Sequence, residues 1–193
     1  MNGREAFQIL ATKIREAKIL DYPFPHICIR DVLPEGFYRQ LLKELPALSE
    51  YRVNSKYPGR GPDGKVNTLV FDDFKREPWK SFAEGIYSDD FAKLLLDKFS
   101  VTKPGYSSFY LHKDLEGFEI KPHTDITSKL ITYLFYLPED DALREQLGTY
   151  LCISKDPALE KQSGTHHPWE MFEIAKKIEY VPNSFFAFAP HDR

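Results

Sequence analysis

Apolar positions in the first half of the chain recur with the spacing of amphipathic helices. Between residues 4 and 20 they stand three or four residues apart, with charged side chains between them, which predicts a helix. Pro34 begins a second predicted helix that runs to Leu45 and ends before Pro46, because proline has no amide hydrogen for the next turn. A third helix is predicted over residues 89–99, and we expect all three to pack on a sheet.

The second half of the chain consists of short aromatic and aliphatic runs separated by turns. These runs are SSFYL, FEI, LITYLFYL, TYLCI, KIEYV and SFFAFA. Several short strands without intervening helices predict an antiparallel sandwich or jelly roll. We therefore expect one α+β domain over residues 1–193, with a mainly β core in residues 100–193 and a helical part in residues 1–99. Residues 154–173 are expected to form an irregular insert between two strands.

Two further segments lack strand or helix periodicity. Residues 52–65 contain three glycines, two prolines and four basic side chains, which predicts a long loop. Such a loop can act as a lid over a site or can be a solvated connection with no role, and both interpretations stay open. A turn is expected at Pro78 and Trp79.

Composition narrows the class of protein. A net charge of -3 gives no basic surface for nucleic acid or anionic membrane, so small-molecule or peptide partners are expected. Charged residues interrupt the first 20 positions and no long apolar run follows, so we expect neither a signal peptide nor a membrane span, and a cytoplasmic location. Cys28 and Cys152 stand among apolar neighbours and are expected to be buried free thiols.

Two His-x-Asp triplets offer candidate metal ligands. The first, residues 112–114, precedes a charged turn, and its side chains are expected to face water. The second, residues 123–125, precedes the longest apolar run. In extended backbone, residues i and i+2 point to the same side, so His123 and Asp125 are expected to converge while Thr124 points away. An imidazole and a carboxylate in that arrangement can chelate a metal ion.

Several segments, taken in order, resemble the Fe(II)- and 2-oxoglutarate-dependent oxygenases, especially their prolyl-hydroxylase-like branch with its double-stranded β-helix, a jelly roll. These are PFPHICIRDVLP with the helix after it, IKPHTDITSKLITYLFYLPED, LGTYLCI and VPNSFFAFAP, which together cover most of the chain. The resemblance implies a dioxygenase that binds Fe(II) in a 2-His-1-carboxylate triad and uses 2-oxoglutarate and O2. Such an enzyme hydroxylates an unactivated C–H bond, with succinate and CO2 as co-products. His123 and Asp125 match the first two metal ligands and are the implied catalytic residues.

The resemblance also implies a distal histidine after the run at residues 184–189. His191 stands there, two residues from Arg193, and a ligand so near a free end would be held by a fraying segment. We therefore expect the distal histidine beyond Arg193, with the jelly-roll core incomplete at its C-terminus, and keep His191 as the alternative metal ligand.

For the outer carboxylate of 2-oxoglutarate, the resemblance implies Tyr110 and Thr149 as binding residues. Lys129 and Arg193 are further candidate cations. The tandem histidines at residues 166–167 have side chains that diverge in extended backbone, and we expect them in a surface loop. Two other functions stay open. One is a jelly-roll binding module with an incomplete metal site, and the other is a cupin-type protein that uses another divalent ion.

Overall fold

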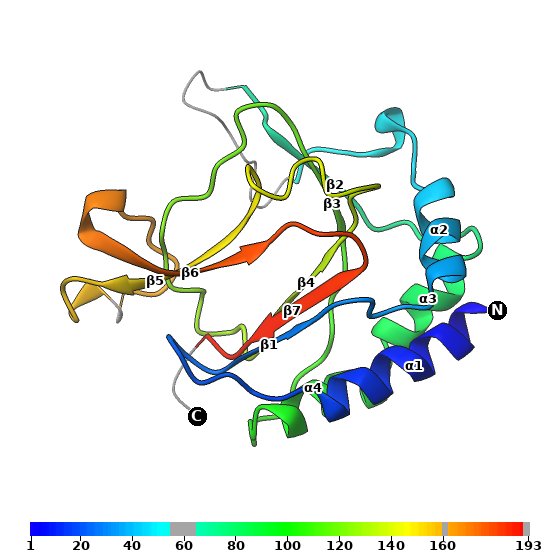
Figure 1. The fold of residues 1–193 in the computed structure, drawn as a ribbon, viewed down its shortest axis with the longest axis horizontal. Coiled ribbons are helices and arrows are strands. Elements are labelled where there is room, and N and C mark those ends of the chain that lie inside the picture. Colours follow the sequence, from blue (N-terminus) through cyan, green and yellow to red (C-terminus); the bar gives the residue numbers. More distant parts are fainter. Residues whose placement is uncertain (55–64, 160–161, 191–193) are drawn as a thin grey trace.

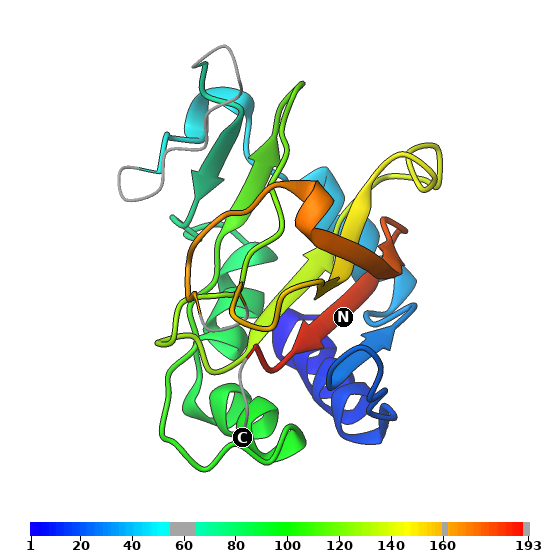
Figure 2. The same ribbon diagram turned by 90° about the vertical axis from the view of Figure 1, so that its left-hand side faces the viewer.

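The computed structural model describes residues 1–54, 65–159 and 162–190 (Figure 1). Helices lie on one side of a three-stranded antiparallel sheet, and a two-stranded sheet lies on the other side (Figures 1 and 2). In chain order the helices and strands are α1 (Gly3–Glu16), β1 (His26–Ile29), α2 (Glu35–Lys43), β2 (Thr68–Phe71), α3 (Trp79–Ile86), α4 (Asp89–Lys98), β3 (Leu111–Asp114), β4 (Thr132–Tyr136), β5 (Gly148–Ser154), β6 (Phe172–Glu179) and β7 (Ser184–Phe188).

The three predicted helices are present, with shifted ends. Helix α1 is capped by Asn2, whose side chain accepts a hydrogen bond from the amide of Glu5, and the helix ends at Glu16 rather than at residue 20. Helices α2 and α4 match the predicted ranges 34–45 and 89–99 to within two residues. Their buried faces join one large core with α1 and the central sheet.

Helix α3 corrects the prediction of a turn at Pro78 and Trp79. Its buried side chains are Trp79, Phe82, Ala83 and Ile86, which follow helical spacing. Proline is a turn residue but also suits the first position of a helix, so Pro78 was ambiguous in the sequence. Trp79 anchors the helix start by donating its indole N–H to the carbonyl of Leu41 at 3.0 Å.

Strand β7 is the centre of the main sheet, with β1 and β4 antiparallel on its two sides. Alternation along β7 divides the core, because Phe185 faces the helices while Phe186 faces β5 and β6. The pair β5–β6 contributes Leu151 and Ile178 to this second, smaller core. A second, smaller core therefore lies between the two sheets, beside the helical core.

Several strand predictions were wrong in detail. Residues 107–110 of SSFYL and all of FEI lie outside strands, and β3 instead covers Leu111–Asp114 and pairs with β2. Strand β4 is five residues long rather than eight. The predicted insert 154–173 contains a short 3-10 helix at Trp169–Met171, and β6 already begins at Phe172. In the described ranges the antiparallel sheets do not join into a closed barrel.

The cysteines are free but not buried as expected, since Cys28 is exposed and Cys152 is intermediate. Most of the predicted loop 52–65 and His191 with Arg193 lie outside the described residues. Among the residues described, no helix is both long and apolar enough to cross a lipid bilayer.

Candidate functional site

His123 and Asp125 lie close together just before β4. The Nδ1 atom of His123 lies 2.9 Å from the carbonyl oxygen of Lys121, and a carbonyl only accepts, so Nδ1 carries the proton. The lone pair is therefore on Nε2, and Nε2 lies 3.9 Å from the Oδ1 atom of Asp125. This backbone contact fixes the tautomer that a metal ligand needs.

Asp125 is the best-anchored carboxylate in this region. It is only 8 % exposed, although an isolated buried carboxylate would be costly. Lys129 donates to its Oδ1 atom and Thr132 to its Oδ2 atom, both at 2.6 Å. Thr132 begins β4 and pairs with Phe188 at the end of β7, so the central sheet holds this carboxylate in place.

The donor geometry approaches that of two ligands on one ion. Two atoms that each bind a divalent transition-metal ion at about 2.1 Å, at a right angle, lie about 3 Å apart. Nε2 of His123 and Oδ1 of Asp125 are within about an ångström of that separation, and Lys129 occupies Oδ1. The residues therefore fit a metal ion if the ammonium of Lys129 moves away. In the described part of the chain, no group of three His, Cys, Asp or Glu side chains could hold an ion.

The insert after β5 crosses directly over the His-x-Asp triplet. The amide of Gly164 donates to the carbonyl of Thr124 at 2.7 Å, and the hydroxyl of Ser163 donates to the carbonyl of Asp125 at 3.1 Å. The imidazole of His166 stacks on that of His123, with ring centroids 4.6 Å apart and planes 4° apart. Sequence reasoning missed this contact because the two segments are distant in the chain.

The tandem histidines therefore differ from the predicted surface loop. His166 is exposed, but His167 is only 7 % exposed, and its amide donates to the carbonyl of Pro122 at 2.9 Å. The Nε2 atom of His167 is buried without a hydrogen-bond partner among the described residues. The prediction of a surface position is confirmed for His166 and wrong for His167.

The first His-x-Asp triplet forms most of β3 and precedes a turn, and its three side chains are exposed, so the prediction that they face water is confirmed. Burial is the main cause that lowers the pKa of His112 and raises the pKa of Asp114. Thr68 of β2 donates to Asp114 at 2.8 Å.

Tyr136 is a polar residue that sequence reasoning missed. Thr132, Leu134 and Tyr136 alternate along β4 and share its inner face, and the hydroxyl of Tyr136 lies 2.5 Å from that of Thr149. Burial raises the pKa of Tyr136 to about 12. Four residues of extended strand separate this pair from Thr132 by about 13 Å. The alternation in the sequence was the signal that could have identified it.

The residues predicted to bind 2-oxoglutarate lie in different parts of the structure. Thr149 lies between the sheets, where it contacts Tyr136. Tyr110 is 44 % exposed, and its ring lies 6.4 Å from that of His112. Lys129 contacts Asp125. His191 and Arg193 lie outside the described residues.

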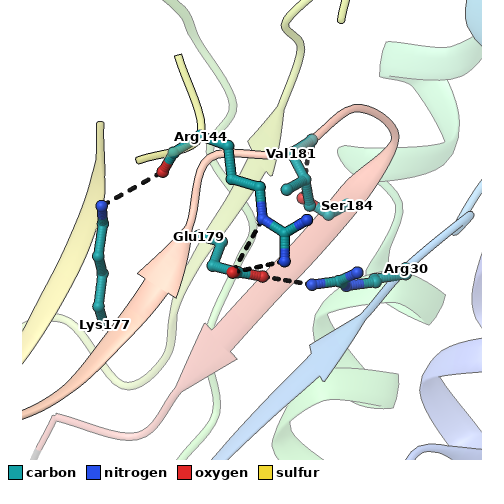
Figure 3. A network of polar contacts seen from close by, with 6 residues as sticks. All are labelled: Arg30, Arg144, Lys177, Glu179, Val181 and Ser184. Atoms are coloured by element: carbon teal, nitrogen blue, oxygen red, sulfur yellow. Dashed lines mark hydrogen bonds and ion pairs between the residues drawn. The ribbon is translucent and has the colours of Figure 1, made fainter. Parts of the chain in front are cut away.

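A separate network of polar contacts joins β6, the segment after β1 and the loop after β4 (Figure 3). Glu179 at the end of β6 accepts from Nε and Nη2 of Arg144 at 2.9 and 2.6 Å, and from Arg30 after β1. Lys177 donates to the carbonyl of Arg144. The contacts with Arg144, foremost its hydrogen bond, lower the pKa of Glu179. The network ties the loop after β4 to two strands.

His26, which is fully buried on β1, should make the stability of the protein depend on pH. Desolvation is the main cause that lowers its pKa, and nearby Lys176 lowers it further, against the hydrogen bond to Phe24. The unfolded chain, with an ordinary histidine pKa of about 6.5, then binds the proton more strongly than the folded chain. The contribution of neutral His26 is thus fully present above about pH 6.5 and is lost below it, by up to about 1.4 kcal/mol per pH unit. Denaturant unfolding at pH 7.5, 6.5 and 5.5 should show a shallower loss in His26→Phe than in the wild type, and parallel profiles would contradict this.

Comparisons of the chain with protein-family models, with curated proteins and with solved structures found no match in any of the three. The function therefore has to be argued from the chemistry of the site.

Proposed function

We propose that this protein is an Fe(II)- and 2-oxoglutarate-dependent dioxygenase that hydroxylates an unactivated C–H bond of a small molecule or peptide. The observation that carries the proposal is the pair of donors that lies beside Thr132, at the start of β4. His123 presents the unprotonated Nε2 to the carboxylate of Asp125 at 3.9 Å, and a backbone carbonyl fixes that tautomer. This chemistry suits two ligands of a facial triad.

The arrangement of strands supports a jelly roll as the fold of this enzyme. Strands β4 and β7 pair antiparallel in one sheet, β5 and β6 pair antiparallel in another, and the side chains of both meet in one core. Strand β7 ends opposite Thr132, so the chain leaves the sheet beside Asp125. A third ligand that follows β7 is consistent with that direction.

Each side chain has a defined task under this proposal. His123 and Asp125 would hold the metal ion, and Thr132 would keep the carboxylate oriented through its hydrogen bond. Bound iron, together with 2-oxoglutarate and O2, would supply the oxidation of the C–H bond. Tyr136 and Thr149 present hydroxyl groups inside the sheets, where they can donate to a carboxylate, and Tyr110 remains a further candidate.

Anaerobic addition of Fe(II) and 2-oxoglutarate tests the proposal directly. A weak visible charge-transfer band is expected in the wild-type protein and is expected to vanish in His123→Ala, because one of the two donors is removed. Thr127→Ala is the matched control, since Thr127 is exposed and lies in the same segment. Absence of the band in folded wild-type protein would refute the proposal.

A binding module without catalysis is the second candidate, favoured by the presence of only two converging donors among the described residues. It predicts no band and no succinate. A cupin-type protein would instead retain another divalent ion after loading, which elemental analysis of the dialysed protein would detect.

A further inference from the structure

The insert after β5 is attached to the metal-binding triplet at consecutive positions. Besides the contacts of Gly164 and Ser163, the amide of His167 bonds to the carbonyl of Pro122. His123 and His166 also form an isolated antiparallel β-bridge. We call residues 163–167 the strap. The strap is thus fixed on both sides of His166, which determines where that imidazole lies.

The stacked rings of His123 and His166 cannot bind one ion in this arrangement. Their planes are parallel to within 4°, so the in-plane lone pairs run side by side rather than toward a common point. Contact through the ring face leaves Nε2 of His123 free for a metal ion. His166 can therefore act by limiting the rotation of the His123 ring.

We infer that His166 is a positioning residue for the metal centre, an inference that rests on the proposed function. Within the described ranges, the side chain of His123 makes one hydrogen bond, from Nδ1 to the carbonyl of Lys121, and is 29 % exposed. One hydrogen bond permits rocking of the ring about that contact. The flat face of His166 removes this freedom and keeps Nε2 directed at Asp125. Loss of contacts that orient a metal ligand typically costs about tenfold to a hundredfold in metal affinity.

Three variants of the full chain separate ring stacking from other effects. His166→Ala removes the ring, His166→Phe keeps a flat aromatic face without nitrogen atoms, and Thr165→Ala changes an exposed neighbour in the strap. Affinity is measured by titration with Co(II), which reports coordination by its visible spectrum. We expect the dissociation constant to rise at least about tenfold in His166→Ala and to stay within about threefold of wild type in the other two.

NMR spectra of the metal-free protein, with nitrogen-15 in its histidines, provide a readout that does not depend on metal. In the wild type and in His166→Phe, the ring signals of His123 should show a ring-current shift and one tautomer. In His166→Ala the ring-current shift should vanish and the ring signals of His123 should broaden, because the ring rocks about its hydrogen bond to Lys121.

The outcomes distinguish the two claims. Unchanged Co(II) affinity in His166→Ala would overturn the positioning role, and so would an equal loss in His166→Phe, which would mean that a nitrogen atom of His166 acts. If wild-type protein binds no Co(II), the proposed function fails. The NMR comparison then decides the positioning role alone, because an unchanged His123 in His166→Ala overturns it and a changed one supports it.

Discussion

Replacement of Lys129 by methionine is expected to tighten the binding of Fe(II) by about tenfold to a hundredfold. The ammonium of Lys129 lies 2.6 Å from Oδ1 of Asp125, the same oxygen that lies 3.9 Å from Nε2 of His123. A metal ion must displace this ammonium from Asp125 and is then repelled by its positive charge. Two unit charges about 4 Å apart interact by about 4 kcal/mol at an effective dielectric constant of about 20.

Solvent reduces this effect on the metal affinity. The side chain of Lys129 is 48 % exposed and can turn toward water once the ion binds. We therefore expect a repulsion of about 1.4 to 2.8 kcal/mol between Lys129 and the metal ion. Its removal corresponds to a gain of about tenfold to a hundredfold in Fe(II) affinity. Methionine keeps much of the length and apolar volume of the lysine stem, so the change removes mainly the charge.

Anaerobic titration with Fe(II) measures the effect, with Lys103→Met as the control because it removes the same charge from an exposed loop. Equal or weaker Fe(II) binding in Lys129→Met would contradict the expectation. The same variant tests the earlier idea that Lys129 pairs with the carboxylate of 2-oxoglutarate. In that case the affinity for 2-oxoglutarate would fall, whereas removal of a competitor for Asp125 would leave it unchanged.

Features of this protein that depend on local spacing could be predicted from its sequence. Helices α1, α2 and α4 follow from apolar residues three and four positions apart, and β7 follows from its run of apolar residues. The approach of His123 and Asp125 follows from the i, i+2 geometry of extended backbone. Each of these signals lies within one short segment.

Features that depend on contacts between distant segments could not be predicted in the same way. The pairing of β2 with β3 places the first His-x-Asp triplet in a strand, which the residues of the triplet alone did not predict. Packing of the strap on Pro122 buries His167, although a histidine in a polar insert usually faces water. The ion pair of Lys129 and the stack of His166 likewise depend on tertiary placement. Helix α3 was missed for another reason, since Pro78 is compatible with both a turn and a helix start.

Phe185→Ala is expected to lower the free energy of unfolding by about 3 to 5 kcal/mol. Phe185 lies on β7, between Ile29 of β1 and Phe135 of β4, and is 1 % exposed. Its ring centroid lies 4.8 Å from that of Phe135 and 6.2 Å from that of Tyr133. Removal of the ring loses this apolar burial and leaves a cavity that three strands and the helices cannot all fill, because their backbones are paired.

Denaturant unfolding followed by circular dichroism measures the loss. Phe185→Leu is the graded control and should cost less, because it keeps most of the apolar volume. Tyr106→Ala is the surface control, since Tyr106 is 89 % exposed, and should change stability by no more than about 0.5 kcal/mol. A loss below about 1 kcal/mol in Phe185→Ala would mean that β7 is not the centre of the core. The metal-donor side chains of His123 and Asp125 are held by contacts with Lys121, Thr132 and the strap. The folded fraction of Phe185→Ala should therefore bind Fe(II) with nearly wild-type affinity.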